Sequence, residues 1–477
     1  MDTSFEADAG AQDLERIFHL QRKSFDQSKA PDLAERRLAL RALEAGVLGS
    51  ADALTDAVAT DFGRRSREET RLAEIFPLIH ELRHIRRHLG AWMKPLIVPG
   101  DWMLWPARAW IRYDPLGVVG VIAPWNYPLV LALSPLANAL SAGNRVMLKL
   151  SERTPATNRV LESLLGRVFP KTQVAVITGG PRVGEAFAAL PFDHLIFTGS
   201  TEVGRKILAR ASTHLTPVTL ELGGKSPAIV DQGFPLGKAA ERIVAGKFLN
   251  AGQTCIAPDY VLLPRQALGA FEGFLKSSLA RRYPGGLASP DYTWIIDPDH
   301  RIRLERLLED ARGRGGEIVP LLPDARGGSS DRAFAPTVVR NCQADMAILR
   351  EEIFGPILPL IAYDDLEEAI AHIRSGPLPL VIYYFGDNRN RLDQVLRSTR
   401  SGAVTVNDTL IHFVHNGLPF GGVGGSGMGQ YHGVYGFRTF SKARSVLRGG
   451  HWSGFSLLNP PYGSRTRRLL DSLIKWC

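Results

Sequence analysis

The sequence predicts an α/β fold in which helices cover two largely parallel sheets. Three observations support this prediction. Strand-like and helical runs alternate from residue 117 onward, a second such series extends from about residue 227 to about residue 415, and the chain before residue 95 has helical spacing. At 477 residues the chain is long for a single core, so we expect two or three domains.

The elements follow in chain order. Residues 10–90 mix charged and apolar side chains at helical spacing, as in LAERRLALRALEAGVL at 33–48. In the first alternating series we expect a strand at 117–124, a helix at 133–143, a strand at 145–150, a helix at 154–169, and strands at 174–178 and 194–200. The second series begins with a strand at 228–230, a helix at 239–252 and a strand at 259–264, and the glycine-rich stretch 418–429 is expected to be a loop.

One segment could be mistaken for a membrane span. Residues 115–144 carry no charged side chain and are long enough to cross a bilayer. Pro124, Pro128 and Pro135 interrupt the segment, and in lipid they would leave backbone groups without partners. We therefore expect a buried strand, loop and helix in the core.

Two further segments lie outside the alternating pattern. MLWPARAWIRYDP at 103–115 has aromatic and apolar residues broken by prolines, which predicts an edge hairpin. The tail 464–477 alternates basic and apolar residues at the spacing of a short amphipathic helix. This helix either packs on the body of the protein or rests on an anionic membrane. We favour packing, because so short a helix has weak membrane affinity.

Composition excludes several classes of function. The net charge of +9 is dispersed along the chain, so we expect neither a nucleic-acid partner nor a basic binding tract. The three cysteines, Cys255, Cys342 and Cys477, form no CxxC pair, so we expect no disulfide framework and no metal site. The acidic residues 1–18 lack the order of a signal peptide, and we expect a cytoplasmic protein.

Three residues stand in contexts that indicate chemistry. A lone cysteine is usually a buried inert thiol, but Cys255 lies between small residues in NAGQTCIAP. Glu221 precedes Gly223 and Gly224 at the end of a strand, which fits a base held where backbone and substrate approach closely. Asn126 follows a buried strand in APWNYP. It either bonds its own turn or donates to an oxyanion.

Together these motifs resemble those of the aldehyde dehydrogenase superfamily. The matching segments run in order along the chain: PWNYP at 124–128, KLSE at 149–152, FTGSTEVG at 197–204, ELGGK at 221–225, GQTC at 252–255, EEIFGP at 351–356 and LPFGG at 418–422. QTCIAPDY and GMGQYHGVYGFRTFS are similar to the class 3 branch, and residues 61–89 resemble the bacterial coniferyl aldehyde dehydrogenases more closely still.

The resemblance implies a fold with a Rossmann-like cofactor domain, an α/β catalytic domain and a small β oligomerisation hairpin. We expect residues 1–95 and 116–222 in the cofactor domain, 223–425 in the catalytic domain, 96–115 and 426–460 in the oligomerisation element, and 461–477 in the tail. A homodimer is expected, with contacts near 100–115 and 430–450, because an isolated hairpin is marginally stable in water.

The resemblance also implies a mechanism. The Cys255 thiolate attacks the aldehyde carbon, and the Asn126 amide with the backbone N–H of Cys255 holds the oxyanion. One such donor typically stabilises the transition state by about 3 to 4 kcal/mol. Hydride then passes to NAD(P), and Glu221 activates the water that hydrolyses the thioester.

Cofactor and substrate residues are carried over by position. Lys149 and Glu152 would bond the adenosine ribose, Ser200 and Val203 would open a helix facing the pyrophosphate and adenine, and Glu352 and Phe354 would hold the nicotinamide ribose. Pro124, Trp125, Gly199 and Leu222 complete the expected cofactor site. No GxGxxG fingerprint is present, and Leu150 stands where the family usually has proline. Because Glu152 would repel a 2′-phosphate, we expect NAD to be preferred and NADP tolerated.

For the substrate pocket we expect an apolar, roomy cavity. Class 3 enzymes carry tryptophan where this chain has Ala245, and Ile411, His412 and Phe413 are expected to form another wall together with Tyr127 and Ile256. Such a pocket suits bulky aromatic, terpenoid or long-chain aldehydes such as coniferyl aldehyde.

Three alternatives remain for the function. A CoA-acylating enzyme generally lacks a glutamate at the position of Glu221. A structural protein derived from the family tends to lose the nucleophile, whereas Cys255, Glu221 and Asn126 are all present. A basic nucleic-acid or membrane binder with a borrowed fold would bind heparin or anionic vesicles in a salt-dependent way.

Overall fold

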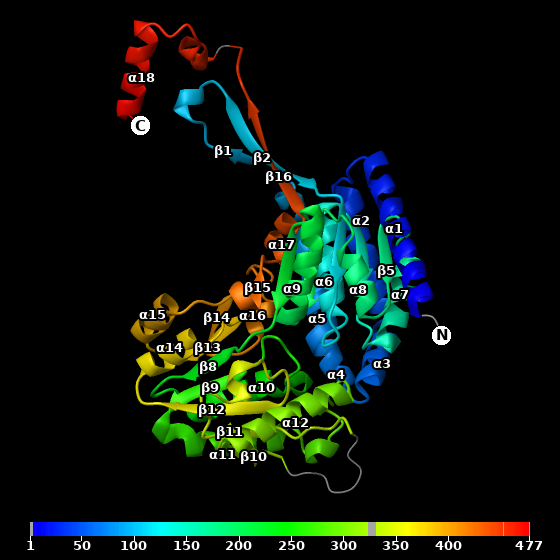
Figure 1. Ribbon diagram of the computed structural model, residues 1–477, viewed down its shortest axis with the longest axis vertical. Helices are drawn as coiled ribbons and strands as arrows, with labels where there is room; N and C mark the ends of the chain where they lie inside the picture. The colour runs from blue at the N-terminus through cyan, green and yellow to red at the C-terminus, as the bar shows by residue number, and fades with distance from the viewer. Residues whose placement is uncertain (1–2, 323–330, 452, 477) are drawn as a thin grey trace.

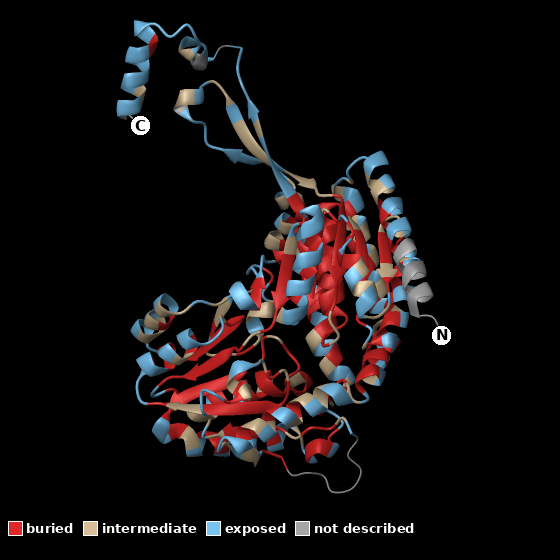
Figure 2. Ribbon diagram, in the orientation of Figure 1, coloured by how far each residue is buried: buried red, intermediate tan, exposed pale blue. Residues whose placement is uncertain are grey.

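The structure is a computed structural model that describes residues 3–322, 331–451 and 453–476. Two α/β bodies are stacked along the long axis, and a narrow three-stranded sheet projects from one end (Figure 1). The buried residues concentrate in the two large sheets and in the helices that face them (Figure 2).

The first body is a six-stranded sheet with the order β15-β7-β6-β3-β4-β5. Its strands are β3 (Val118–Ile122), β4 (Arg145–Lys149), β5 (Val174–Ile177), β6 (His194–Gly199), β7 (Val218–Leu222) and the short antiparallel β15 (Gly427–Met428). The other pairings are parallel. From β3 the chain adds β4 and β5 on one side and then β6 and β7 on the other. The carboxyl end of β3 is therefore the topological switch point, where sheets of this kind bind ligands.

Helices cover both faces of this sheet. On one face lie α1 (Thr3–Gln27), α8 (Pro181–Ala188) and α9 (Thr201–Ala211), and on the other lie α2 (Leu33–Gly49), α5 (Phe76–Trp92), α6 (Val130–Ala142) and α7 (Pro155–Val168). Against the latter pack α3 (Ala51–Phe62) and α17 (Gly433–Thr439), and α4 (Arg67–Thr70) packs on α3. The uncharged segment 115–144 supplies β3 and α6, with α6 buried along its whole length, as the sequence predicts. No helix formed by the described residues has the length and apolar character needed to span a membrane.

The second body is a seven-stranded sheet with the order β10-β11-β12-β9-β8-β13-β14, in which only β10 is antiparallel. The strands are β8 (Pro227–Val230), β9 (Tyr260–Pro264), β10 (Glu317–Pro320), β11 (Thr337–Arg340), β12 (Ile357–Tyr363), β13 (Val381–Phe385) and β14 (Ala403–Val406). The helices are α10 (Leu236–Phe248), α11 (Leu268–Arg282), α12 (Pro298–Gly313), α13 (Ala347–Arg350), α14 (Leu366–Ser375), α15 (Arg389–Ser398) and α16 (Ile411–Val414).

The projecting sheet pairs β1 (Leu96–Val98), β2 (Arg108–Pro115) and β16 (Ser441–Arg448), all antiparallel. The sequence assigns the whole segment 426–460 to this element. In the structure the segment divides, because β15 pairs with β7 and α17 packs on α6, so that only β16 joins the small sheet. The glycine-rich stretch 418–429 is a loop that ends in β15.

The tail forms the predicted helix, α18 (Ser464–Trp476), but its packing differs from the prediction. Figure 1 shows α18 beside the tip of the small sheet, far from both bodies. Ile474 is 75% exposed, and Leu469 and Leu470 are also exposed, so the apolar face packs against neither body of this protomer. The prediction that the tail packs on the body of its own chain is therefore wrong. The final residue of the predicted helix, Cys477, lies outside the described residues.

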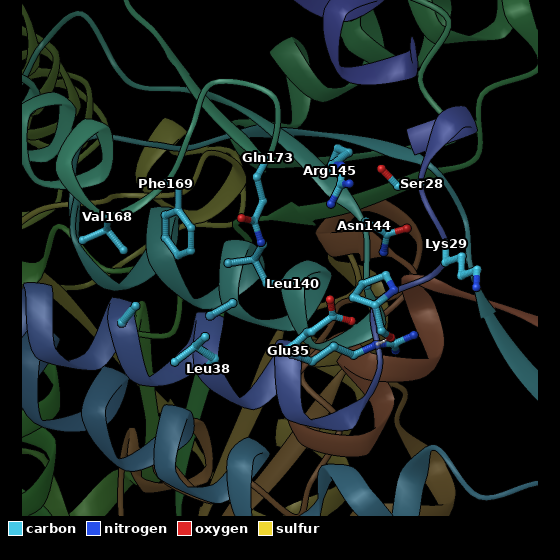
Figure 3. A pocket seen from close by; sticks show the side chains of 15 residues that line it. Ser28, Lys29, Glu35, Leu38, Leu140, Asn144, Arg145, Val168, Phe169 and Gln173 are labelled. Atoms are coloured by element: carbon cyan, nitrogen blue, oxygen red, sulfur yellow. Dashed lines mark hydrogen bonds between the residues drawn. The ribbon is translucent and has the colours of Figure 1, made fainter. Parts of the chain in front are cut away.

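One cavity of about 470 Å³ lies between the start of α2, the end of α7 and the turn before β4 (Figure 3). Much of its polar wall is already bonded within the protein. Arg36 donates to the carbonyls of Pro31 and Ser141, and the Asn144 amide bonds four backbone groups. These bonds tie the chain together around Arg36 and Asn144. Cys255 is not among the residues that line this cavity.

Candidate active site

Cys255 lies where two cavities meet. One cavity, of about 520 Å³, faces the six-stranded sheet, and the other, of about 280 Å³, faces α5 and α6. The cysteine follows α10 through a short turn in which Asn250 and Ala251 have φ values of 52° and 50°. Such left-handed residues are uncommon outside glycine and cluster at functional sites.

Hydrogen bonds join Asn126 to the loop that carries the cysteine. Asn126 Nδ2 donates to the carbonyl of Gln253 at 3.1 Å, and Asn250 Nδ2 donates to the carbonyl of Asn126 at 2.9 Å. One N–H of the Asn126 amide therefore holds the loop, while the second remains available to a ligand in the cavity that Asn126 lines with Cys255.

Glu221 is the next-to-last residue of β7 and lines the same cavity as Cys255 and Asn126. Both of its carboxylate oxygens are buried and accept no hydrogen bond from the described residues, and burial raises the pKa of this carboxyl well above its usual value. Burial also raises the pKa of the Cys255 thiol to about 12, with smaller contributions from the charges of Glu352 and Glu221. The free thiol is thus protonated at neutral pH and needs a base to become a nucleophile.

All ten predicted cofactor residues line one continuous pair of cavities. The cavity of about 520 Å³ opens beside a second of about 440 Å³ along the carboxyl ends of β3, β4 and β6, and several residues line both. Pro124, Trp125, Gly199, Ser200, Leu222, Glu352 and Phe354 line the first, and Lys149, Glu152 and Val203 line the second. Ser200 caps α9 by accepting from Val203 N, which leaves the N-terminus of that helix facing the cavity.

Local contacts explain the position of Glu352 and the leucine at position 150. A Cβ at Gly223 would overlap the carboxylate of Glu352, so only glycine lets Glu352 approach. Burial, followed by the charge of Asp259, raises the pKa of Glu352 to about 8. Leu150 takes the place of a proline, and its backbone N–H bonds the carbonyl of Ile177, a contact that proline could not make.

The smaller cavity is apolar. Its walls contain no charged side chain, and the hydroxyls of Tyr127 and Thr254 bond each other at 2.7 Å. Tyr127, Ile256, Ile411 and Phe413 line it, as the sequence predicts.

Two predicted wall residues do not line this cavity. Ala245 lies on α10, and the lining residue of that region is Leu249. His412 bonds Thr405 through Nδ1 and stacks on Phe420, behind the wall that its neighbours form. The sequence indicated which segments lie near the cysteine, but helix rotation decided which side chains face it.

Several lining residues were not predicted from the sequence. Leu72, Ala73, Phe76 and Pro77 reach the apolar cavity from a π-helical turn (Arg71–Ile75) and the start of α5. On the cofactor side, His300 and Arg303 project from α12, and His300 contacts Trp125 at 4.8 Å between ring centroids. No short motif marks these helical residues. Within the described residues, no cluster of three or more histidine, cysteine or carboxylate groups could hold a metal ion.

Comparison with known proteins decides the family. A sequence profile described as "Aldehyde dehydrogenase family" matches residues 5–446. The chain belongs to the aldehyde dehydrogenase family. Membership makes it an NAD(P)-dependent enzyme that oxidises aldehydes, and the cavities described above fit a dinucleotide beside the thiol.

Individual relatives agree with this assignment. The enzyme is 47% identical over 460 residues to a "Probable coniferyl aldehyde dehydrogenase" of Pseudomonas aeruginosa, covering 96% of each chain. It is 37% identical over 478 residues to "Aldehyde dehydrogenase family 3 member B2" of Mus musculus, covering 98% of this chain and 97% of the relative. The predicted resemblance to the class 3 branch and to coniferyl aldehyde dehydrogenases is therefore confirmed.

Solved structures share the fold. "Substrate bound state of Staphylococcus Aureus AldH" matches with a TM-score of 0.90 and 36% identity, covering 96% of this chain and 99% of that one. "NAD+ complex structure of aldehyde dehydrogenase from bacillus cereus" matches with a TM-score of 0.83 and 25% identity, covering 92% and 89%. The predicted α/β fold and NAD as the cofactor are confirmed.

Proposed function

We propose that the enzyme oxidises bulky apolar aldehydes through a thioester on Cys255. The observation that carries this proposal is the position of Cys255, which lines both the apolar cavity and the polar cavity that reaches the carboxyl ends of the cofactor sheet. A carbonyl carbon that enters from the apolar side meets the sulfur with the cofactor cavity directly behind it.

Each predicted catalytic residue has a step. Glu221, or a water that it polarises, takes the proton of the Cys255 thiol, and the thiolate adds to the aldehyde carbon. The free N–H of Asn126 and the backbone N–H of Cys255 donate to the oxyanion. NAD, when held in the cavity that Glu352 and Phe354 line, would supply the hydride acceptor. Glu221 then removes a proton from the water that attacks the thioester, and the carboxylate leaves.

The cofactor is held by the residues that line its cavity. We propose that Lys149 and Glu152 bond the adenosine ribose, that the N-terminus of α9 at Ser200 faces the pyrophosphate, and that Val203 covers the adenine. Glu352 and Phe354 hold the nicotinamide ribose. Two glycines fit this arrangement. A Cβ at Gly199 would overlap the ring of Phe197, and a Cβ at Gly223 would overlap the carboxylate of Glu352.

The substrate class follows from the apolar wall. A cavity of about 280 Å³ without charged side chains favours aromatic, terpenoid or long-chain aldehydes over small hydrated ones. The name of the Pseudomonas aeruginosa relative makes coniferyl aldehyde the first compound to test.

The experiment that tests the thioester is a pre-steady-state burst. Glu221→Gln should still release about one reduced cofactor per active site, more slowly than the wild type because water must take the thiol proton in place of Glu221, and then stall because hydrolysis lacks its base. Denatured, trapped enzyme should carry the acyl mass on the peptide that contains Cys255. Steady turnover of Glu221→Gln at the wild-type rate would show that the assigned base is wrong.

We further propose a cytoplasmic homodimer that associates through the small sheet and α18. Leu96, Ile97, Trp105 and Leu447 expose large apolar surfaces on this projecting element, together with Ile474 on α18. Such exposed edges and patches are unfavourable in a monomer. Sedimentation should give a dimer at micromolar concentration.

Deleting the tail distinguishes two roles for α18, a contact with a second copy of the chain and a contact with a membrane. If α18 packs on a second copy, deleting residues 464–477 should weaken the dimer and leave vesicle binding absent in both forms. If the deletion abolishes binding to anionic vesicles and leaves the dimer intact, the helix is a membrane contact instead.

A further inference from the structure

A buried ion pair lies behind the turn that carries Asn126. Arg65, in the connection between α3 and α4, is 3% exposed, and Glu74, in the π-helical turn, is 0% exposed. Arg65 Nη2 lies 3.2 Å from Glu74 Oε1, and Arg65 Nε lies 3.3 Å from the carboxylate of Glu69. No step of the mechanism above uses these residues.

The pair contacts both ends of the turn. Arg65 Nη1 donates to the carbonyl of Asn126 at 3.0 Å. Glu74 Oε2 accepts from the backbone N–H groups of Leu129 and Val130, at 2.7 and 3.3 Å, where α6 begins. The turn is therefore fixed at its start by a cation and at its end by an anion, and the two ions contact each other.

The same arginine contacts the neighbouring aromatic wall. Its guanidinium carbon lies 4.9 Å from the centre of the Tyr127 ring, and Tyr127 bonds Thr254, the residue before the nucleophile. Arg65 and Asn250 together occupy the carbonyl of Asn126, so the residue is held against the cysteine loop from two directions.

Burial of this pair is difficult to explain by stability alone. Removing two charges from water is costly, and well-packed apolar residues often stabilise a core as well or better. Burial raises the pKa of Glu74 to about 6 even with Arg65 beside it. A charge pair with directed hydrogen bonds does, however, fix a turn in one geometry, which apolar packing does less sharply.

We propose that Arg65 and Glu74 are positioning residues that aim the Asn126 amide at the oxyanion. The inference rests on the proposed role of Asn126. The π-helical turn extends this function to the substrate side, because Glu74 contacts α6 while Leu72 and Ala73 of the same turn line the aldehyde cavity. Single π-turns inside helices are frequent at functional sites.

The test is a double-mutant cycle between Arg65 and Asn126. Arg65→Met should lower kcat/KM for the aldehyde about tenfold to hundredfold, because a small displacement of a catalytic group has effects of this order. The KM for NAD should stay within about twofold. In the Asn126→Ala background, Arg65→Met should lower kcat/KM by less than about twofold, because the effect of Arg65 passes through Asn126.

The matched control is the adjacent arginine. Arg64 donates to the carbonyls of Leu287 and Ala288 and lies over the Trp294 ring, away from the turn. Arg64→Met removes comparable bonds and should leave kcat/KM nearly unchanged at a temperature at which both variants are folded. Arg65→Lys and Glu74→Gln serve if Arg65→Met does not fold, and each should give a smaller loss that also disappears in the Asn126→Ala background.

The outcomes are distinguishable. The positioning role is overturned if Arg65→Met lowers kcat/KM by the same factor in the Asn126→Ala background as in the wild type. It is also overturned if Arg65→Met lowers kcat/KM no more than Arg64→Met does. An Asn126→Ala enzyme with wild-type kcat/KM instead refutes the proposed oxyanion role itself.

Discussion

The two cavities that meet at Cys255 have opposite chemistry. On the cofactor side the wall includes Glu221, Glu352, His300 and Arg303. On the substrate side no charged side chain is present. The proposed function therefore assigns proton transfer and its dependence on pH to the first cavity, and selection among aldehydes to the second. If this division holds, each side can be changed without the other.

Among the described residues, only Leu131 and Cys255 line both cavities, and the largest expected effect is at the Cys255 sulfur. Cys255→Ala should lower kcat at least about a thousandfold for every aldehyde, since no other group can form the covalent bond. NAD should still bind, which fluorescence quenching or calorimetry would show. Residual turnover near the wild-type rate would remove the thioester from the mechanism.

A larger side chain in the apolar wall should act on the substrate side alone. Ala73→Trp should lower kcat/KM for coniferyl aldehyde about tenfold to hundredfold and leave that for acetaldehyde within about threefold, because the indole fills volume that only the larger substrate needs. Ala42→Trp, which fills the remote cavity of Figure 3, is the control. Equal losses for both aldehydes would mean that the substrate lies elsewhere.

The pH profile should reflect the cofactor side. Because burial raises the pKa of Glu221 and that of Cys255, kcat/KM should rise about tenfold or more between pH 6 and pH 8. The ratio of kcat/KM between two aldehydes should stay constant over this range, since no charged group lines their cavity. A ratio that shifts with pH would contradict the division.

The stability of the folded protein should depend on pH through a third group of the cofactor-side cavity, Glu352, and should fall where kcat/KM rises. The pKa of Glu352 is raised to about 8, so the folded state holds this proton more tightly than the unfolded state. The contribution is complete below about pH 4.5 and is lost as the pH rises toward about 8. Glu352→Gln should therefore flatten the fall of Tm over that range, measured by calorimetry without ligand.

The smallest effect concerns the choice of cofactor. Glu152 is partly exposed and forms a 3.2 Å ion pair with Lys149, so solvent screens its charge. Glu152→Gln should raise kcat/KM for NADP relative to NAD about fivefold and leave the preference among aldehydes unchanged. A wild-type preference for NADP would contradict the proposed position of Glu152 beside the ribose.

The sequence by itself determined the cofactor side. Lys149, Ser200 and Leu222 lie in short motifs at or just after the carboxyl ends of β4, β6 and β7. Carboxyl ends of parallel strands meet at one edge of the sheet, so local patterns and chain order are enough to bring these residues together. The buried strands at 118–122 and 194–199 were predictable for the same reason, since their apolar runs allow only a central place.

Only the tertiary structure decided which side chains line the apolar cavity, the ion pair of Arg65 and Glu74, and the position of the tail. Ala73 and Arg65 lie in the segment 61–89, and its family resemblance does not say which side chains face a cavity. No local pattern predicts the π-helical turn that contains Glu74. His412 and Phe413 are adjacent in the chain, yet only Phe413 faces the cavity. Which side of a helix meets a cavity depends on how distant elements pack, and a local pattern does not contain that information.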